Sequence, residues 1–141
     1  MIAAANRLRK HGDYQRVYTS SRKRFAKQMG YFFLLRPAQP TSESSVLSPP
    51  PAGPRVGLTV GRAMGKAVQR NRIKRRMREA IRNQICVLKA SVDVVLHPNR
   101  RVAEIPFSVL ERDITQVFQA VQQEAERQLR GSDVRSERGA E

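Results

Sequence analysis

The sequence is poor in the residues that build metal centres, disulfides and nucleophilic sites. One of its 141 residues is cysteine, two are histidine and none is tryptophan. A single cysteine excludes an internal disulfide and a cysteine-based zinc site, and neither His11 nor His97 has neighbouring metal ligands in the sequence. No serine or cysteine lies within a local signature of a catalytic nucleophile. These absences argue against a metalloenzyme or a hydrolase with a protein nucleophile, and we expect Cys86 to be a buried structural thiol.

Acidic residues and long apolar runs are also scarce. The chain has 12 aspartates and glutamates against 27 lysines and arginines, which gives a formal net charge of +15. Such an excess favours nucleic acid as the partner over an acidic membrane surface. No apolar run approaches the roughly 20 residues that span a bilayer. The start of the chain lacks the apolar segment of a signal peptide, so we expect a cytoplasmic protein.

The basic residues are concentrated in residues 65–82, which read GKAVQRNRIKRRMREAIR. Ile73, Met77 and Ile81 recur every four positions, which predicts a helix with one narrow apolar face. Cationic residues flank that face on both sides, and like charges four residues apart weaken an isolated helix. A solvated charged face is the simpler interpretation, but this density of like charge indicates that a polyanion neutralises it.

The order of the predicted elements indicates an α+β fold. We expect a short helix at 13–20, strands at 25–29, 30–36, 55–60 and 92–96, the basic helix from 66 to about 90, and a last helix that begins at Ser108. This order, α-β-β-β-α-β-α, is typical of helices packed on a small mixed sheet of about four strands. We predict a single RNA-binding domain over residues 1–130, with a flexible inserted loop at 37–54 and a disordered polar tail at 131–141.

The few aromatic residues suggest a second binding surface. Tyr14 and Tyr18 lie one helical turn apart, and Tyr31 and Phe33 share one face of a predicted strand. If that helix lies beside the sheet, these rings could line a groove in which unpaired bases stack, at about 1–3 kcal/mol per base. Simple core packing is the alternative for these four rings, and it is the interpretation that we prefer for Phe32.

The order of the motifs resembles one known family. The segments GKAV at 65–68, RNRIKR at 70–75 and Arg78-Glu79 are similar to the signature of the bacterial ribonuclease P protein component. The similarity extends to DYQRVY at 13–18, RVGLTV at 55–60 and VDVVLHP at 92–98, and it covers about residues 6–121 in the right order.

The resemblance implies a fold in which the basic helix makes a left-handed crossover between parallel strands, against the usual right-handed rule. It also implies an endoribonuclease in which a catalytic RNA subunit removes the 5′ leader of precursor tRNA, with Mg²⁺ bound mainly by that RNA. The protein subunit would hold the RNA and the leader and would supply no catalytic residue.

By position, the resemblance assigns two sets of residues. The set facing the RNA would be Arg62, Lys66, Arg70, Asn71, Arg72, Lys74, Arg75, Arg78 and Arg82. The set facing the leader would be Tyr14, Tyr18 and a residue of the following strand, for which Tyr31 and Phe33 are both candidates and Leu34 is the alternative. Family members usually carry two adjacent basic residues before the helix, whereas Ala63 follows Arg62 here.

Two other classes of function compete with this interpretation. A structural RNA-binding protein, ribosomal or chaperone-like, would explain the charge and the helix equally well but not the aromatic residues or the full order of motifs. An autonomous nuclease would need clustered acids or histidines, which the sequence does not show. The RNA that co-purifies with the protein would separate the first two classes.

Overall fold

A computed structural model describes residues 6–8, 10–36 and 53–139. Its main elements are α1 (His11–Ser20), β1 (Arg24–Phe25), β2 (Met29–Leu35), β3 (Arg55–Leu58), α2 (Ala67–Gln84), β4 (Val92–Pro98) and α3 (Phe107–Gly139). Short 3-10 turns, η3 (Arg62–Met64), η4 (Ile85–Val87) and η5 (Arg100–Ala103), lie between them. The predicted α+β class and the predicted order of helices and strands are therefore confirmed.

The sheet is mixed and has the strand order β1-β2-β4-β3. β2 is antiparallel to both β1 and β4, whereas β3 and β4 are parallel. Because parallel neighbours need a crossover, α2 makes the connection between β3 and β4. This is the kind of connection that the resemblance implies, and its left-handedness stays a prediction.

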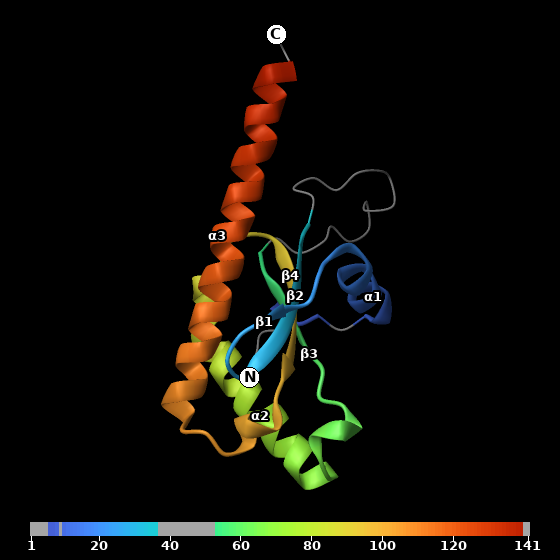
Figure 1. Cartoon of the computed structure of the whole chain (residues 1–141), viewed down its shortest axis with the longest axis vertical. Helices are drawn as coiled ribbons and strands as arrows, with labels where there is room; N and C mark the ends of the chain where they lie inside the picture. The colour runs from blue at the N-terminus through green and yellow to red at the C-terminus, as the bar shows by residue number, and fades with distance from the viewer. Residues whose placement is uncertain (1–5, 9, 37–52, 140–141) are drawn as a thin grey trace.

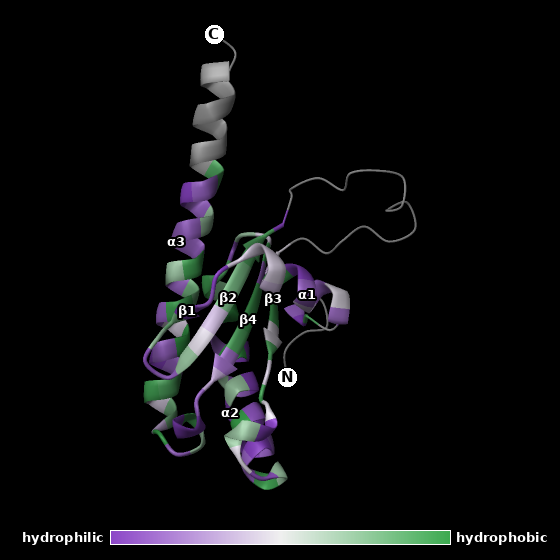
Figure 2. Ribbon diagram, turned by 45° about the vertical axis from the view of Figure 1, so that its right-hand side comes forward, coloured by the Kyte–Doolittle hydropathy of each residue, from purple (hydrophilic) through white to green (hydrophobic). Residues whose placement is uncertain are grey.

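The helices lie on opposite faces of this sheet (Figure 1). α2 and α3 cover one face, and their apolar residues form the main core with alternate residues of the strands, among them Val94 and Leu96 of β4. α1 packs on the other face, where Val17 meets Val95. β4 is therefore buried on both sides, which explains why it is hydrophobic along most of its length (Figure 2).

The apolar stripe predicted for the basic helix is confirmed. Ile73, Met77 and Ile81 are fully buried in the main core. The α-helix itself ends at Gln84, earlier than expected, and continues as the turn η4. Cys86 lies in that turn and is exposed, so the prediction of a buried thiol is wrong.

A buried ion network fixes α1 on the sheet. Arg55 donates from Nε and Nη2 to the two carboxylate oxygens of Asp93, each at 2.8 Å. Its Nη1 lies 3.3 Å from Asp13 of α1, and Arg36 Nε lies 3.1 Å from Asp93. A charge buried in the fold needs such partners. The network thus links the first helix, β3 and β4 at one end of the sheet.

The structure tests the predicted loop, tail and domain bounds only in part. Residues 37–52 lie outside the described residues, so the flexible loop at 37–54 stays a prediction. α3 continues to Gly139, past the point where the tail was expected to begin, since one glycine costs a helix only about 1 kcal/mol. The disorder of 131–141 and the single domain over 1–130 stay predictions. None of the helices in the described residues is long and apolar enough to cross a bilayer.

Candidate RNA interface

α2 presents most of its cations to solvent. Most residues of the predicted RNA-facing set are exposed, namely Arg62, Lys66, Asn71, Arg72, Arg75, Arg78 and Arg82. The other two, Arg70 and Lys74, are half-buried. Among the described residues, one cation of α2 has an acidic partner, because Arg82 pairs with Glu79. We call this surface the cationic face of α2. Apart from Arg82, its cations form no ion pair with an acid of the described chain, and most of them are exposed.

Arg76 of the same helix has a different role. Its Nη1 donates to the carbonyl oxygen of Val102 at 2.7 Å and its Nη2 donates to that of Ile105. Its guanidinium carbon lies 6.0 Å from the centroid of the Phe107 ring. Arg76 therefore fixes the connection before α3 to α2, and we do not count it in the cationic face.

The turn that leads into α2 is fixed by a glycine conformation and by a side chain that binds its backbone. Gly65 has a φ of 122°, in a region that favours glycine. Arg100 donates from Nε and Nη2 to the carbonyl oxygen of Ala63, at 3.0 and 2.6 Å. These contacts set the position of Arg62, which lies on η3 just before the helix.

The second predicted surface is partly assembled as expected. The rings of Tyr14 and Tyr18 lie 6.4 Å apart on α1. The Tyr14 hydroxyl donates to the carbonyl oxygen of Leu8 and accepts from the amide of Leu58, both at 3.2 Å. Both tyrosines are half-buried, with their polar ends anchored in the fold.

Tyr31 and Phe33 do not join the two tyrosines. Their side chains lie on the opposite face of the sheet, in the main core, and are only 7% and 6% exposed. Successive residues of a strand point to opposite faces, so Phe32 is the aromatic residue of β2 that faces α1. The expectation that Tyr31 and Phe33 share a groove with Tyr14 and Tyr18 is therefore wrong. Core packing of Phe32 is confirmed in part, because this ring packs against the smaller core cluster but is only half-buried.

Phe32 and His97 complete the cluster around Tyr18. The Tyr18 ring lies 4.9 Å from that of Phe32, edge-on, and 5.7 Å from that of His97. The Tyr18 hydroxyl bonds with His97 Nε2 at 3.0 Å and with Thr59 Oγ1 at 3.2 Å. We call Tyr14, Tyr18, Phe32 and His97 the aromatic surface. Sequence analysis did not place Phe32 and His97 in this surface, because the sequence alone does not show which face of the sheet α1 covers or how β2 and β4 are aligned.

Burial shapes the chemistry of this surface. It raises the pKa of the Tyr14 hydroxyl above its ordinary value, so that group stays protonated near neutral pH. It also lowers the pKa of His97, and the nearby charge of Lys23 lowers it further. The lowered pKa favours the neutral form of His97, whose ring bonds to Tyr18.

Gly57 of β3 makes room for α1. A Cβ atom at this position would lie 2.6 Å from the Tyr14 hydroxyl oxygen, closer than real contacts allow. The Tyr14 ring can therefore lie over the sheet only because residue 57 has no side chain.

A hollow of about 310 Å³ lies beside the aromatic surface. Among the residues that line it are Lys23, Phe25, Met64 and His97. Phe25 is 78% exposed, and the Lys23 ammonium lies 5.5 Å from its ring. An exposed ring beside a cation is suited to a stacked base. Among the described residues, no three His, Cys, Asp or Glu side chains come together as a metal site.

Comparison with known proteins identifies the family. The family model described as Ribonuclease P matches residues 2–122. The chain is 34% identical over 110 residues to the ribonuclease P protein component of Bartonella quintana, covering 77% of each chain. It has the same identity to that of Brucella suis, over 77% of this chain and 74% of the relative.

Solved structures share the fold of this chain. The RNase P protein of Staphylococcus aureus superposes with a TM-score of 0.62 at 19% identity, over 83% of this chain and 95% of that one. The RNase P protein from Thermotoga maritima superposes with a TM-score of 0.64 at 20% identity, over 81% and 96%. The resemblance read from the motifs is thereby confirmed, and the chain belongs to the Ribonuclease P family of protein components.

Proposed function

We propose that this chain is the protein subunit of a ribonuclease P that removes the 5′ leader of precursor tRNA, and that it works in the cytoplasm. The cationic face of α2 would bind the catalytic RNA, and the aromatic surface would bind the leader. The observation that carries the proposal is the array of cations on α2 that have no acidic partner among the described residues. Membership of the family supports a partnership with RNA.

The cationic face suits a folded RNA. Phosphates of the RNA backbone would replace the counterions around Arg72, Arg75 and Arg78, and the released counterions would drive binding. Arginine offers several donors in a planar fork, which fits phosphate oxygens well. The apolar stripe keeps the helix fixed on the sheet, so the array meets the RNA as a rigid surface.

The aromatic surface suits a single strand. Tyr14, Tyr18 and Phe32 are half-buried, so each ring is held by the fold and still reaches solvent. Unpaired bases stack on such rings with little dependence on sequence. A leader differs in sequence from one precursor to the next, so this is the kind of recognition it needs. We place Phe32 here instead of Tyr31 and Phe33.

The chemistry of cleavage would belong to the RNA. We propose that the RNA subunit binds most of the Mg²⁺ and activates the water that attacks the phosphodiester bond. The chain would position the leader and neutralise phosphates that would otherwise repel each other. Its own residues would then affect substrate affinity and the Mg²⁺ requirement more than the intrinsic rate of the chemical step.

The proposal is tested by comparing substrates with and without a leader. In the enzyme reconstituted with its RNA, Tyr18→Ala is expected to weaken binding of precursor tRNA by about 5- to 160-fold, which corresponds to about 1–3 kcal/mol for one stacked base. Affinity for mature tRNA should not change. Tyr18→Phe keeps the ring and serves as the matched control. An equal loss for both RNAs would make Tyr18 a packing residue and contradict the proposed leader site.

A further inference from the structure

The edge of β2 that faces away from β4 is only partly covered. β1 pairs with β2 at two positions, Arg24 with Tyr31 and Phe25 with Gly30. β2 continues to Leu35, so its last residues extend beyond the end of β1. An open strand edge presents backbone groups that need partners.

Hydrogen-bond alternation shows which backbone groups face this edge. The amide of Ala26 donates to Met29 O at 2.8 Å on the β1 side. The amide of Arg36 donates to Ser91 O at 2.9 Å on the β4 side. Since the direction alternates along an antiparallel strand, the N–H and C=O groups of Phe33 and Leu35 point to the open edge.

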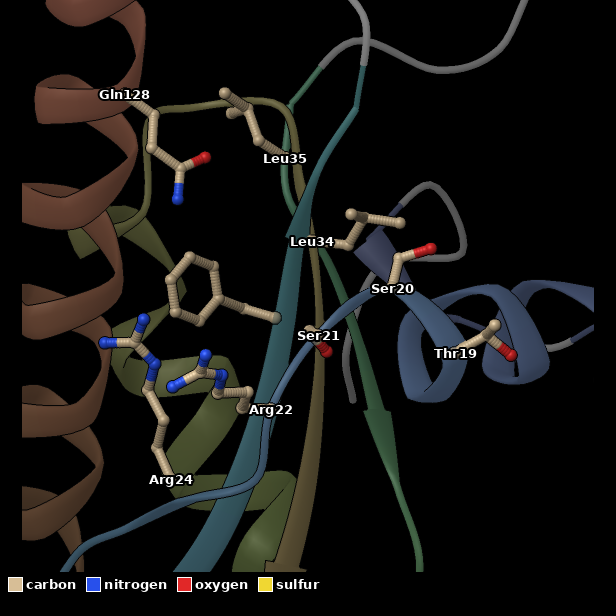
Figure 3. A pocket seen from close by; sticks show the side chains of 9 residues that line it. Thr19, Ser20, Ser21, Arg22, Arg24, Leu34, Leu35 and Gln128 are labelled. Atoms are coloured by element: carbon tan, nitrogen blue, oxygen red, sulfur yellow. The ribbon is translucent and has the colours of Figure 1, made fainter.

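A hollow of about 370 Å³ lies along this edge, between β2, α3 and the connection from α1 to β1 (Figure 3). Arg22 lines it from that connection and Arg24 from the start of β1, and both guanidinium groups extend toward α3. Gln128 lines it from α3. Two cations, an amide side chain and the open edge of β2 therefore border one small space.

Neither of the two arginines forms an ion pair with an acid among the described residues. Glu124 of α3 is paired with Arg127, and the charge of Arg24 acts on it as well, from beyond ion-pair distance. The guanidinium carbon of Arg24 lies 4.8 Å from the centroid of the Phe33 ring, which holds that side chain in place. A stacked guanidinium is pre-organised for phosphate and loses little freedom on binding.

We propose that this hollow, the β2-edge site, binds backbone phosphates of single-stranded RNA, namely the distal part of the leader. The inference rests on the proposed function, because the leader must already lie on the aromatic surface. Leu34 connects the two places, since it packs against the same buried cluster as Tyr14 and Tyr18 and also lines the hollow. A strand that passes Leu34 reaches Arg22 and Arg24, whose fixed charges match its phosphates.

The test uses the reconstituted enzyme and three RNAs: precursor with a long leader, precursor with a leader cut to the nucleotides nearest the cleavage site, and mature tRNA. The double variant Arg22→Gln/Arg24→Gln is expected to weaken binding of the long-leader precursor. Each phosphate contact contributes about 0.7 to the slope of log affinity against log salt concentration, so each contact that the variant loses should weaken binding by about 4-fold at 0.15 M salt. The other two RNAs should bind as before. Lys27→Gln/Arg112→Gln, which removes the same charge from exposed positions outside the hollow, is the matched control.

Three outcomes would overturn the inference. Equal weakening for all three RNAs would assign the phosphates to the catalytic RNA. Unchanged RNA affinities, with poly-glutamate binding to the unmodified protein and not to the variant, would assign the edge to an acidic peptide. Unchanged affinities for every probe would leave the hollow without a ligand. Tyr18→Ala, measured in parallel, separates failure of this inference from failure of the leader site itself.

Discussion

The substitution Asp93→Asn is expected to destabilise the protein severely. Asp93 is fully buried in β4 and accepts two hydrogen bonds from Arg55, each at 2.8 Å. Arg36 lies 3.1 Å away on the same carboxylate. Asparagine has nearly the same size as aspartate, so the substitution removes the negative charge without opening a cavity. The largely buried guanidinium of Arg55 would keep its contact with Asp13, while both Arg55 and Arg36 would lose their contact with the Asp93 charge.

The size of the effect follows from the burial of the network. Removing one partner of a buried ion pair typically costs about 3–5 kcal/mol. Arg55 keeps its contact with Asp13, so we expect about 3 kcal/mol, the lower end of that range. A small domain is stable by only about 5–15 kcal/mol. For a denaturant slope of about 2 kcal/mol per molar urea, the midpoint of unfolding should fall by about 1.5 M.

Urea unfolding followed by circular dichroism measures this loss, and the chain offers a matched control. Asp113 of α3 is 4% exposed, and its buried oxygen Oδ2 has no hydrogen-bond partner among the described residues. Asp113→Asn removes a buried charge that no cation of the described chain pairs with, so stability should stay the same or rise. If Asp93→Asn costs no more than Asp113→Asn, the network does not hold α1 on the sheet and the reasoning is refuted.

Two further predictions concern charge. Arg72→Ala/Arg75→Ala should reduce the log–log salt slope of RNA binding by about one to two units, since each phosphate contact contributes about 0.7–0.9. The control is Lys27→Ala/Arg112→Ala. An unchanged slope in the first variant, or an equal change in the control, would place the RNA on another face. The pKa of His97 is lowered in the folded state, so as the pH falls the unfolded chain takes up this proton at a higher pH than the folded protein does. The free energy of unfolding should therefore decrease as the pH drops below about 6.5. In His97→Gln that component of the pH dependence should disappear from urea unfolding curves; the same decline in both proteins would show that other groups cause it.

The basic helix was the element most open to prediction from sequence. Ile73, Met77 and Ile81 define its buried face by spacing alone, and that face fixes where the cations must lie. The exposure of Arg72, Arg75 and similar residues followed from the same geometry. A period of 3.6 residues relates positions that are close in the chain, so it needs no knowledge of the rest of the fold.

The aromatic surface could be predicted only in part. A strand pattern separates Tyr31 and Phe33 from Phe32, but it does not say which face the larger helices will cover. α2 and α3 together bury the face that holds Tyr31 and Phe33, which leaves Phe32 beside α1. That outcome depends on packing between elements far apart in the sequence.

The ion network was also beyond local reasoning. Asp13 near the start of a helix is favourable for the helix dipole, and that local role was sufficient to explain it. Its contact with Arg55, 42 residues away, and the contact of Arg55 with Asp93, a further 38 residues along, arise only after β3 and β4 pair. No pattern in one sequence connects these three residues.

The central claim is that the chain binds RNA with its cationic face and that the RNA breaks the phosphodiester bond. The most direct test is cleavage of precursor tRNA at low Mg²⁺ by the purified protein, by the catalytic RNA, and by the two together. We expect removal of the 5′ leader only when both are present. Cleavage by the protein alone, after residual RNA has been removed, would contradict the claim.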